Sequence, residues 1–309
     1  MKRRNLLKSA AFTSMGAMGS MLLPLSQSPL SPRLKIAVSS YSYWHFKPPK
    51  VSIHEVIDRA ARLGVEGVDI LHRQMDSEDR DYLMSIKQKA FVNGIDLISL
   101  SIHQDFVDPL AEERQKAIDH TIHCIELAYQ MGIPCIRLNS GRWGTIKSFD
   151  DLMANRGEEP PIEGYDAEDA FAWCINGIQA CLAKARECGV LLALENHWGL
   201  TRTVEGLLKI VTGVNSPWLG VLMDTGNFME EPYDKLEALA PFTKFVQAKT
   251  YYGGGEWYTL DLDYDRIFQI LKDANYLGYV SIEFEGKAPA DEGVEKSVSL
   301  LREVLKKKY

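Results

Sequence analysis

The chain has 309 residues, of which 46% are hydrophobic and 25% are charged. This composition is typical of a folded globular protein and excludes a disordered, collagen-like or coiled-coil chain. The formal net charge is −7, from 42 acidic and 35 basic side chains. A general nucleic-acid binder normally carries a basic face, so we expect no nucleic-acid partner.

The N-terminal segment has the features of an export signal. Arg3 and Arg4 stand side by side in RRNLLK, and an apolar run rich in Gly, Ala and Met extends to about residue 25. A short cationic head before a short apolar core predicts a signal peptide over residues 1–27, the alternative being an uncleaved anchor. RRNLLK resembles the twin-arginine export signal, which implies a periplasmic protein that meets the membrane only during export.

Eight repeats of one pattern follow, each an apolar run, a polar loop and an amphipathic helical stretch. The expected strands are residues 34–39, 65–71, 95–103, 133–139, 190–195, 218–224, 244–249 and 279–285. Short apolar runs that alternate with helices predict buried parallel strands with crossover helices. Eight such units predict a single-domain α/β fold, a (β/α)8 TIM barrel, over residues 33–309.

The main alternative is an open doubly wound sheet, but no G-x-G-x-x-G follows the first expected strand. Glycines stand just before five strands, and we expect each to end a helix in the left-handed conformation: Gly64, Gly94, Gly132, Gly189 and Gly278. The longest irregular stretch, residues 141–165, is expected to be a functional loop such as a lid.

The five cysteines are odd in number and lack C-x-x-C spacing, so we expect neither a disulfide framework nor a zinc knuckle. Cys174, Cys181 and Cys188 recur every seventh residue and predict a buried stripe on a helix.

Carboxylates end several of the last strands, where barrel enzymes carry their reactive groups. Glu195, Asp224 and Glu283 are each flanked by apolar residues, so we expect them to point inward. Three carboxylates converging in one barrel mouth would repel one another unless a cation held them. The sequence therefore predicts a divalent metal site.

The segments LENH (194–197), MDTGN (223–227) and SIEF (281–284) resemble the xylose isomerase-like barrels of sugar isomerases and epimerases, which include tagatose epimerase, hydroxypyruvate isomerase and class II apurinic-site endonucleases. The resemblance covers essentially the whole chain after the signal. It implies a metal set formed by Glu195, Asp224, Gln247 and Glu283. Gln247 stands where the family usually has His, and its amide oxygen favours Mn²⁺ or Mg²⁺ over Zn²⁺.

The family's chemistry is proton transfer next to a carbonyl through a metal-stabilised enediolate. The resemblance makes Glu195 and Glu283 the acid–base pair. The remaining candidates are expected to contact a sugar substrate: His103, Arg137, Asn139, His197, Lys249 and Trp44. For Lys249 a salt bridge across the mouth is an equal alternative. Trp143, Trp198 and Trp257 also fall in loops on this face, where aromatic planes suit sugar rings.

The leading hypothesis is thus a metal-dependent sugar isomerase or epimerase, an enzyme that acts on a small sugar or keto sugar. A 3-keto-glycoside lyase working by β-elimination is the close alternative, and a non-catalytic exported sugar-binding protein is an alternative of another class. The apurinic-site nuclease is disfavoured because Asn227 and Gln247 stand where its zinc cluster needs histidines. The sequence leaves the oligomeric state open, and a homo-oligomer is compatible with it.

Overall fold

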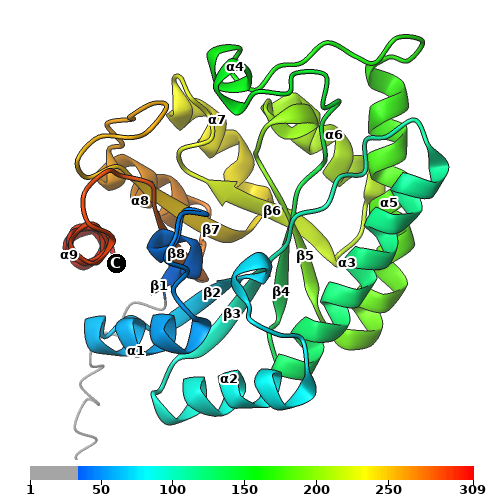
Figure 1. Cartoon of the computed structure of the whole chain (residues 1–309). Helices are drawn as coiled ribbons and strands as arrows, with labels where there is room; N and C mark the ends of the chain where they lie inside the picture. Colours follow the sequence, from blue (N-terminus) through cyan, green and yellow to red (C-terminus); the bar gives the residue numbers. More distant parts are fainter. Residues whose placement is uncertain (1–33) are drawn as a thin grey trace, which may run out of the picture. The chain divides into compact units, whose positions relative to one another are not determined.

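A computed structural model describes residues 34–309, and the predicted signal peptide lies outside them. Eight parallel strands close into a barrel in which each strand pairs with the next and β8 pairs with β1 (Figure 1). The predicted TIM barrel is therefore confirmed. The strands are β1 (Lys35–Ser39), β2 (Gly67–Leu71), β3 (Asp96–Ser101), β4 (Cys135–Leu138), β5 (Leu191–Glu195), β6 (Leu219–Asp224), β7 (Thr243–Thr250) and β8 (Tyr279–Phe284).

Helices surround this barrel (Figure 1). They are α1 (Ile53–Leu63), α2 (Arg80–Val92), α3 (Ala111–Met131), α4 (Phe149–Ala154), α5 (Ala167–Cys188), α6 (Val204–Val214), α7 (Pro232–Leu239), α8 (Tyr264–Asp273) and α9 (Ala290–Lys308). Short 3-10 helices follow three of the strands, η1 (Ser40–Tyr43), η2 (His72–Gln74) and η3 (Gly199–Thr201), and a fourth, η4 (Ala240–Phe242), connects α7 to β7. Among residues 34–309, no helix has the length and apolar character that crossing a bilayer requires.

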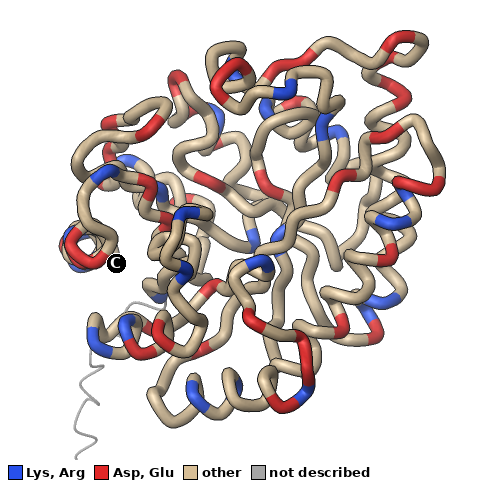
Figure 2. The backbone as a smooth tube through the Cα atoms, in the orientation of Figure 1, with Lys and Arg blue, Asp and Glu red and all other residues tan. Residues whose placement is uncertain are grey.

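Charged residues of both signs lie on the outer helices α3 and α5 (Figure 2). Lys184 of α5 pairs with Glu126 of α3 at 2.9 Å, so some of these charges join neighbouring helices. Cys174 and Cys181 are buried on α5 and Cys188 is half-buried at its end, which largely confirms the predicted stripe.

Glycine ends four of the helices as predicted, with positive φ at Gly64, Gly94, Gly132 and Gly189. The prediction for Gly278 is wrong. Before β8 the left-handed residue is Asn275, with φ 56°, because α8 ends earlier at Asp273. Gly278 serves a different need: a Cβ there would lie 2.5 Å from the hydroxyl oxygen of Tyr276.

The long stretch after β4 is more ordered than predicted, since it contains α4. The buried carboxylate of Glu159 holds its first part by accepting hydrogen bonds from the backbone N–H groups of Gly144 (3.1 Å) and Ile146 (2.9 Å) and by pairing with Arg142. One buried side chain thus organises the loop that follows β4.

The barrel strands alternate between two environments. Residues such as Leu192, Leu194, Val221 and Met223 belong to the large apolar core between strands and helices. Their neighbours in sequence face the barrel axis, where the smaller apolar cluster is Ala37, Ile98, Cys135, Ala193, Leu222 and Phe245. Because side chains of a strand alternate, residues two positions beyond this cluster also face the axis, nearer the carboxyl ends. Glu195 and Asp224 occupy such positions.

Candidate active site

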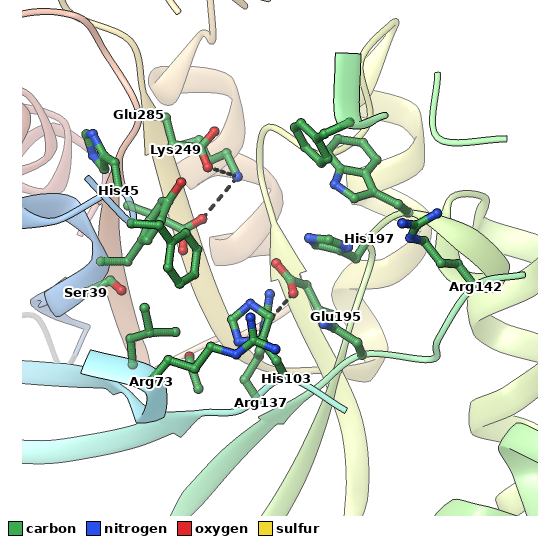
Figure 3. Close-up of a pocket in the computed structure, with 18 of the residues that line it drawn as sticks. Ser39, His45, Arg73, His103, Arg137, Arg142, Glu195, His197, Lys249 and Glu285 are labelled. Carbon is green, nitrogen blue, oxygen red and sulfur yellow. Dashed lines mark hydrogen bonds and ion pairs between the residues drawn. The ribbon is translucent and has the colours of Figure 1, made fainter. Parts of the chain in front are cut away.

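A cavity of about 740 Å³ opens at the carboxyl ends of the strands. Its wall includes Arg137 from β4, Glu195 from β5, Lys249 from β7 and Glu283 from β8. Figure 3 shows Arg137 and Glu195 on one side of this space and Lys249 and Glu285 on the other. Two predicted proton-handling carboxylates, Glu195 and Glu283, therefore share a single cavity.

Arg137 and Glu195 form a buried ion pair in this cavity (Figure 3). The Nε atom of Arg137 donates to Oε2 of Glu195 over 2.6 Å, and Nδ2 of Asn227 donates to Oε1 over 3.1 Å. Burial raises the pKa of Glu195, and the charge of Arg137 only partly opposes this effect. Glu195 is thus a carboxyl group with a raised proton affinity, the property required of a general acid–base group near neutral pH.

Lys249 lies among three carboxylates. Its Nζ atom is 2.8 Å from Oε1 of Glu285, 3.1 Å from Oε2 of Glu283 and 3.7 Å from Oδ2 of Asp224. Burial acts to lower the pKa of Lys249, but the attraction of these carboxylates outweighs it and holds the pKa well above its usual value. The predicted alternative of a salt bridge across the mouth is therefore present, and Lys249 also lines the cavity.

Asp224 and Gln247 are buried but do not line the cavity. Oδ1 of Asp224 accepts from the backbone N–H groups of Gly226 (2.8 Å) and Asn227 (3.0 Å), and Nε2 of Gln247 donates to Oδ2 of Asp69 over 2.9 Å. Within residues 34–309, Oδ2 of Asp224 and Oε1 of Gln247 have no hydrogen-bond partner. Buried acceptor oxygens that receive no hydrogen bond are suited to bind a cation, so Asp224 and Gln247 fit a hard divalent metal ion.

The charge balance of the site corrects the argument made from sequence. The predicted repulsion took only carboxylates into account and left out the charges of Arg137 and Lys249, which already supply two positive charges next to Glu195 and Glu283. Among residues 34–309, Glu195, Asp224 and Glu283 are not a set whose ligand atoms gather within 4.8 Å of one another. Repulsion among these carboxylates therefore does not by itself require a metal.

Burial raises the pKa of Asp224 well above its usual value, as it does for Glu195. The site thus favours either protons or a further cation. Four carboxylates face the two cations when all are ionised: Glu195, Asp224, Glu283 and Glu285.

Three further predicted contact residues line the cavity, namely His103, Asn139 and His197. Burial, with the charge of Arg137 adding to it, lowers the pKa of His103 to about 2, and the same causes place the pKa of His197 well below its usual value. Both imidazoles are therefore neutral at pH 7. Oδ1 of Asn139 is buried and lacks a hydrogen-bond partner in the described chain.

The predicted aromatic contacts divide into two groups. Trp198 and Trp257 line the cavity, whereas Trp44 and Trp143 do not. Trp44 instead packs against Phe46 with tilted rings whose centroids are 5.0 Å apart, and Trp143 packs on Trp173. These two side chains thus pack on neighbouring aromatic rings and do not form part of the cavity wall.

Sequence reasoning missed Asp69, a fully buried carboxyl group in the middle of β2. It accepts hydrogen bonds from Ser101 and Gln247, and burial raises its pKa to about 7. A signal was present, because Asp69 is an acidic residue inside the apolar run 65–71. A carboxylate at an inward position of such a run marks a polar barrel interior.

Residues 57–304 match the family described as the xylose isomerase-like TIM barrel. The chain belongs to this family. No curated protein sequence matches it. Solved structures of similar fold include a D-psicose 3-epimerase from Clostridium cellulolyticum H10, with TM-score 0.68 and 15% identity over 88% of this chain and 99% of that one.

Two further structures of similar fold are epimerases by their names. An L-ribulose 3-epimerase has TM-score 0.71 and 14% identity, and the match covers 89% of the chain described here and 95% of the epimerase chain. A 3-keto-D-glucoside 4-epimerase from E. coli has TM-score 0.68 and 16% identity, over 87% and 99% of the two chains. At such identities the likeness establishes the fold alone.

Proposed function

We propose that this protein is a sugar isomerase or epimerase that moves a proton next to a carbonyl group. The observation that carries the proposal is that Glu195 and Glu283, from β5 and β8, line one cavity together with the cations Arg137 and Lys249. Such a cavity offers two groups that exchange protons and two fixed positive charges for the oxyanion formed by enolisation. The epimerases of similar fold support this class of reaction.

In the proposed reaction one glutamate removes the α-proton and the other returns a proton to the opposite face or to the adjacent carbon. Arg137 and Asn227 fix the carboxyl group of Glu195 by one hydrogen bond to each oxygen, so its remaining lone pairs have a defined direction. Lys249 contacts Glu283 from the other side by an ion pair, with Nζ 3.1 Å from Oε2. Neutral His103 and His197 and the amide of Asn139 supply hydrogen bonds for sugar hydroxyl groups.

A divalent ion held by Glu195, Asp224, Gln247 and Glu283 would polarise the substrate carbonyl group and offset the negative charge on its oxygen. The buried acceptor oxygens of Asp224 and Gln247 that have no hydrogen-bond partner within residues 34–309 support this ligand set. Mn²⁺ or Mg²⁺ suits these oxygen donors better than Zn²⁺.

Solvent deuterium incorporation into a panel of keto sugars, with and without Mn²⁺, tests the proposal. We expect the wild type to exchange the α-proton, and Glu195→Gln and Glu283→Gln to lose at least about 100-fold of the rate, as expected for a positioned acid–base group. Glu256→Gln is the matched control, because Glu256 lies at the same end of the barrel but pairs with Lys47. Absence of exchange with every sugar, together with measurable sugar binding, would favour the non-catalytic alternative.

A second candidate, a 3-keto-glycoside lyase, uses the same enolising groups to expel the substituent at the β-position. The volume of about 740 Å³ and the rings of Trp198, Trp257 and Tyr258 on the wall favour it, since they provide room and apolar surface beyond one sugar ring. Product analysis separates the candidates: an epimerised sugar supports the first, whereas an unsaturated keto sugar with released aglycone supports the second.

A further inference from the structure

A second group of metal-ligand side chains lies outside the cavity wall, where the connection after β2 meets α3. Within residues 34–309, His72, His120 and Cys124 are the set of His, Cys, Asp or Glu side chains that brings one potential ligand atom each within 4.8 Å of the others. His72 begins η2, whereas His120 and Cys124 lie one turn apart on α3. Residues four apart share a face of a helix, so both face His72.

The distances in this group suit a tetrahedral ion. Sγ of Cys124 is 4.0 Å from Nδ1 of His72 and 3.7 Å from Nε2 of His120. With Zn–S near 2.3 Å and Zn–N near 2.0–2.1 Å, tetrahedral angles place such ligand atoms about 3.5 Å apart. The two sulfur–nitrogen separations therefore need to contract by only about 0.2–0.5 Å, and the ligand nitrogens of the two histidines lie within 4.8 Å of each other.

A carboxylate orients the first of these ligands. Oε1 of Glu78 lies 2.7 Å from Nε2 of His72, and Oε2 of the same group lies 2.6 Å from Nε2 of His123. A proton on Nε2 of His72, shared with Glu78, leaves the lone pair of Nδ1 directed at Cys124. Metal-binding histidines in proteins are usually held in this way, with the second ring nitrogen bonded to a carboxylate.

We propose that His72, His120 and Cys124 bind a Zn²⁺ ion, with solvent completing the coordination. Two imidazoles and one thiolate are typical ligands of Zn²⁺, unlike the oxygen donors of the barrel mouth. Cys124 is buried and the side chain of His72 is only 13% exposed, so the ion is shielded on the protein side.

The ion would connect two elements that are distant in the sequence. The two sequence neighbours of His72, Leu71 and Arg73, both line the cavity, and Figure 3 shows Arg73 there. Zn²⁺ at this site therefore holds the β2–α2 connection against α3 and fixes one part of the cavity wall.

Titration of the metal-free protein with Co²⁺, followed by absorption, tests the site. Thiolate coordination gives an intense sulfur-to-cobalt charge-transfer band, which oxygen ligands in the barrel mouth do not produce. We expect this band at one equivalent, its disappearance on adding Zn²⁺, and its loss in Cys124→Ser. Cys188→Ser is the matched control, because Cys188 is half-buried at the end of α5 and belongs to no such group.

Two more variants separate this site from the barrel mouth and from misfolding. Glu78→Gln changes a largely exposed group, so the protein stays folded while affinity for Zn²⁺ falls about 10–100-fold. Asp224→Asn alters the barrel mouth and leaves the band unchanged, even if the proposed function fails. The proposal is overturned if no charge-transfer band forms, or if the band persists in Cys124→Ser.

Discussion

Arg137 and Glu195 face each other diagonally across the pair β4–β5, where Arg137 lies opposite Ala193, two residues before Glu195. Their side chains are 8% and 1% exposed, and Nε and Oε2 are 2.6 Å apart. A pair this deeply buried costs free energy to desolvate, so its two members depend on each other. This dependence can be measured.

Replacing Arg137 with Met leaves Glu195 buried without its cation. We expect Arg137→Met to lower the free energy of unfolding by about 3–5 kcal/mol at pH 7. The double variant Arg137→Met/Glu195→Gln removes the stranded charge, so it should recover most of that loss. Urea denaturation measures all three proteins, and a double variant no more stable than Arg137→Met would contradict the interpretation.

Substitution of Gln247 tests the proposed metal ligands through Mn²⁺ affinity, a measurement separate from stability. Imidazole is a stronger donor than an amide oxygen, so Gln247→His should tighten Mn²⁺ binding by about tenfold, or about 1.4 kcal/mol. Gln247→Leu, which keeps a similar size but offers no donor, should weaken it. Calorimetric titration gives both constants. Equal affinities in the three proteins would remove Gln247 from the proposed ligand set.

The strands and the positions of Glu195 and Glu283 could be predicted because both follow from local pattern. Apolar runs bounded by helix-ending glycines mark buried strands, and alternation along a strand decides which side chains face the axis. The helix α4 was missed although its N-cap is visible in the sequence. The Ser148 hydroxyl accepts from the backbone N–H of Asp151 over 3.3 Å, but a six-residue helix is too short to show periodicity.

The partners of the carboxylates could not be predicted in the same way. Which cation meets Glu195 depends on the register of β4 against β5 and on the reach of the Arg137 side chain, and neither is a local property. The contact between His72 and Cys124 could not be predicted either, because 52 residues separate them in the sequence and only the folded chain brings them together. Long-range pairing decided the electrostatics of both sites.

The buried carboxyl group of Asp105 should make the free energy of unfolding depend on pH. Burial raises its pKa to about 6, although the backbone N–H groups of Val107 (2.8 Å) and Arg142 (3.2 Å) donate to it and act in the opposite direction. Because the pKa in the folded state lies above the ordinary value of 3.8, the folded protein binds the proton more tightly. The resulting stabilisation is complete below that ordinary value and is lost as the pH rises through about 6.

Comparison with Asp105→Asn isolates this contribution, since the amide oxygen still accepts the backbone hydrogen bonds. Between about pH 4 and pH 6.5 the wild type should lose about 1–3 kcal/mol of unfolding free energy relative to the variant, at about 1.4 kcal/mol per pKa unit. Denaturation at closely spaced pH values measures the difference. Parallel curves for the two proteins would show that the carboxyl group is not perturbed.

Trp257 joins the loop after β7 to α4 over the cavity. Its Nε1 donates to Oδ1 of Asp150 over 2.6 Å, and its ring lies edge-on to Phe149 with centroids 4.6 Å apart. The Trp257 residue is 44% exposed, so Trp257→Ala should change stability little.

Loss of an aromatic wall contact of about 0.5–1.5 kcal/mol in Trp257→Ala should raise KM about 2–10-fold at nearly constant kcat. Trp257→Phe keeps an aromatic ring but loses the hydrogen bond to Asp150, so its KM should lie between those of the wild type and Trp257→Ala. Steady-state kinetics on the sugar that exchanges deuterium measures the effect, and a fall in kcat at constant KM would place Trp257 in the chemical step instead of the binding wall.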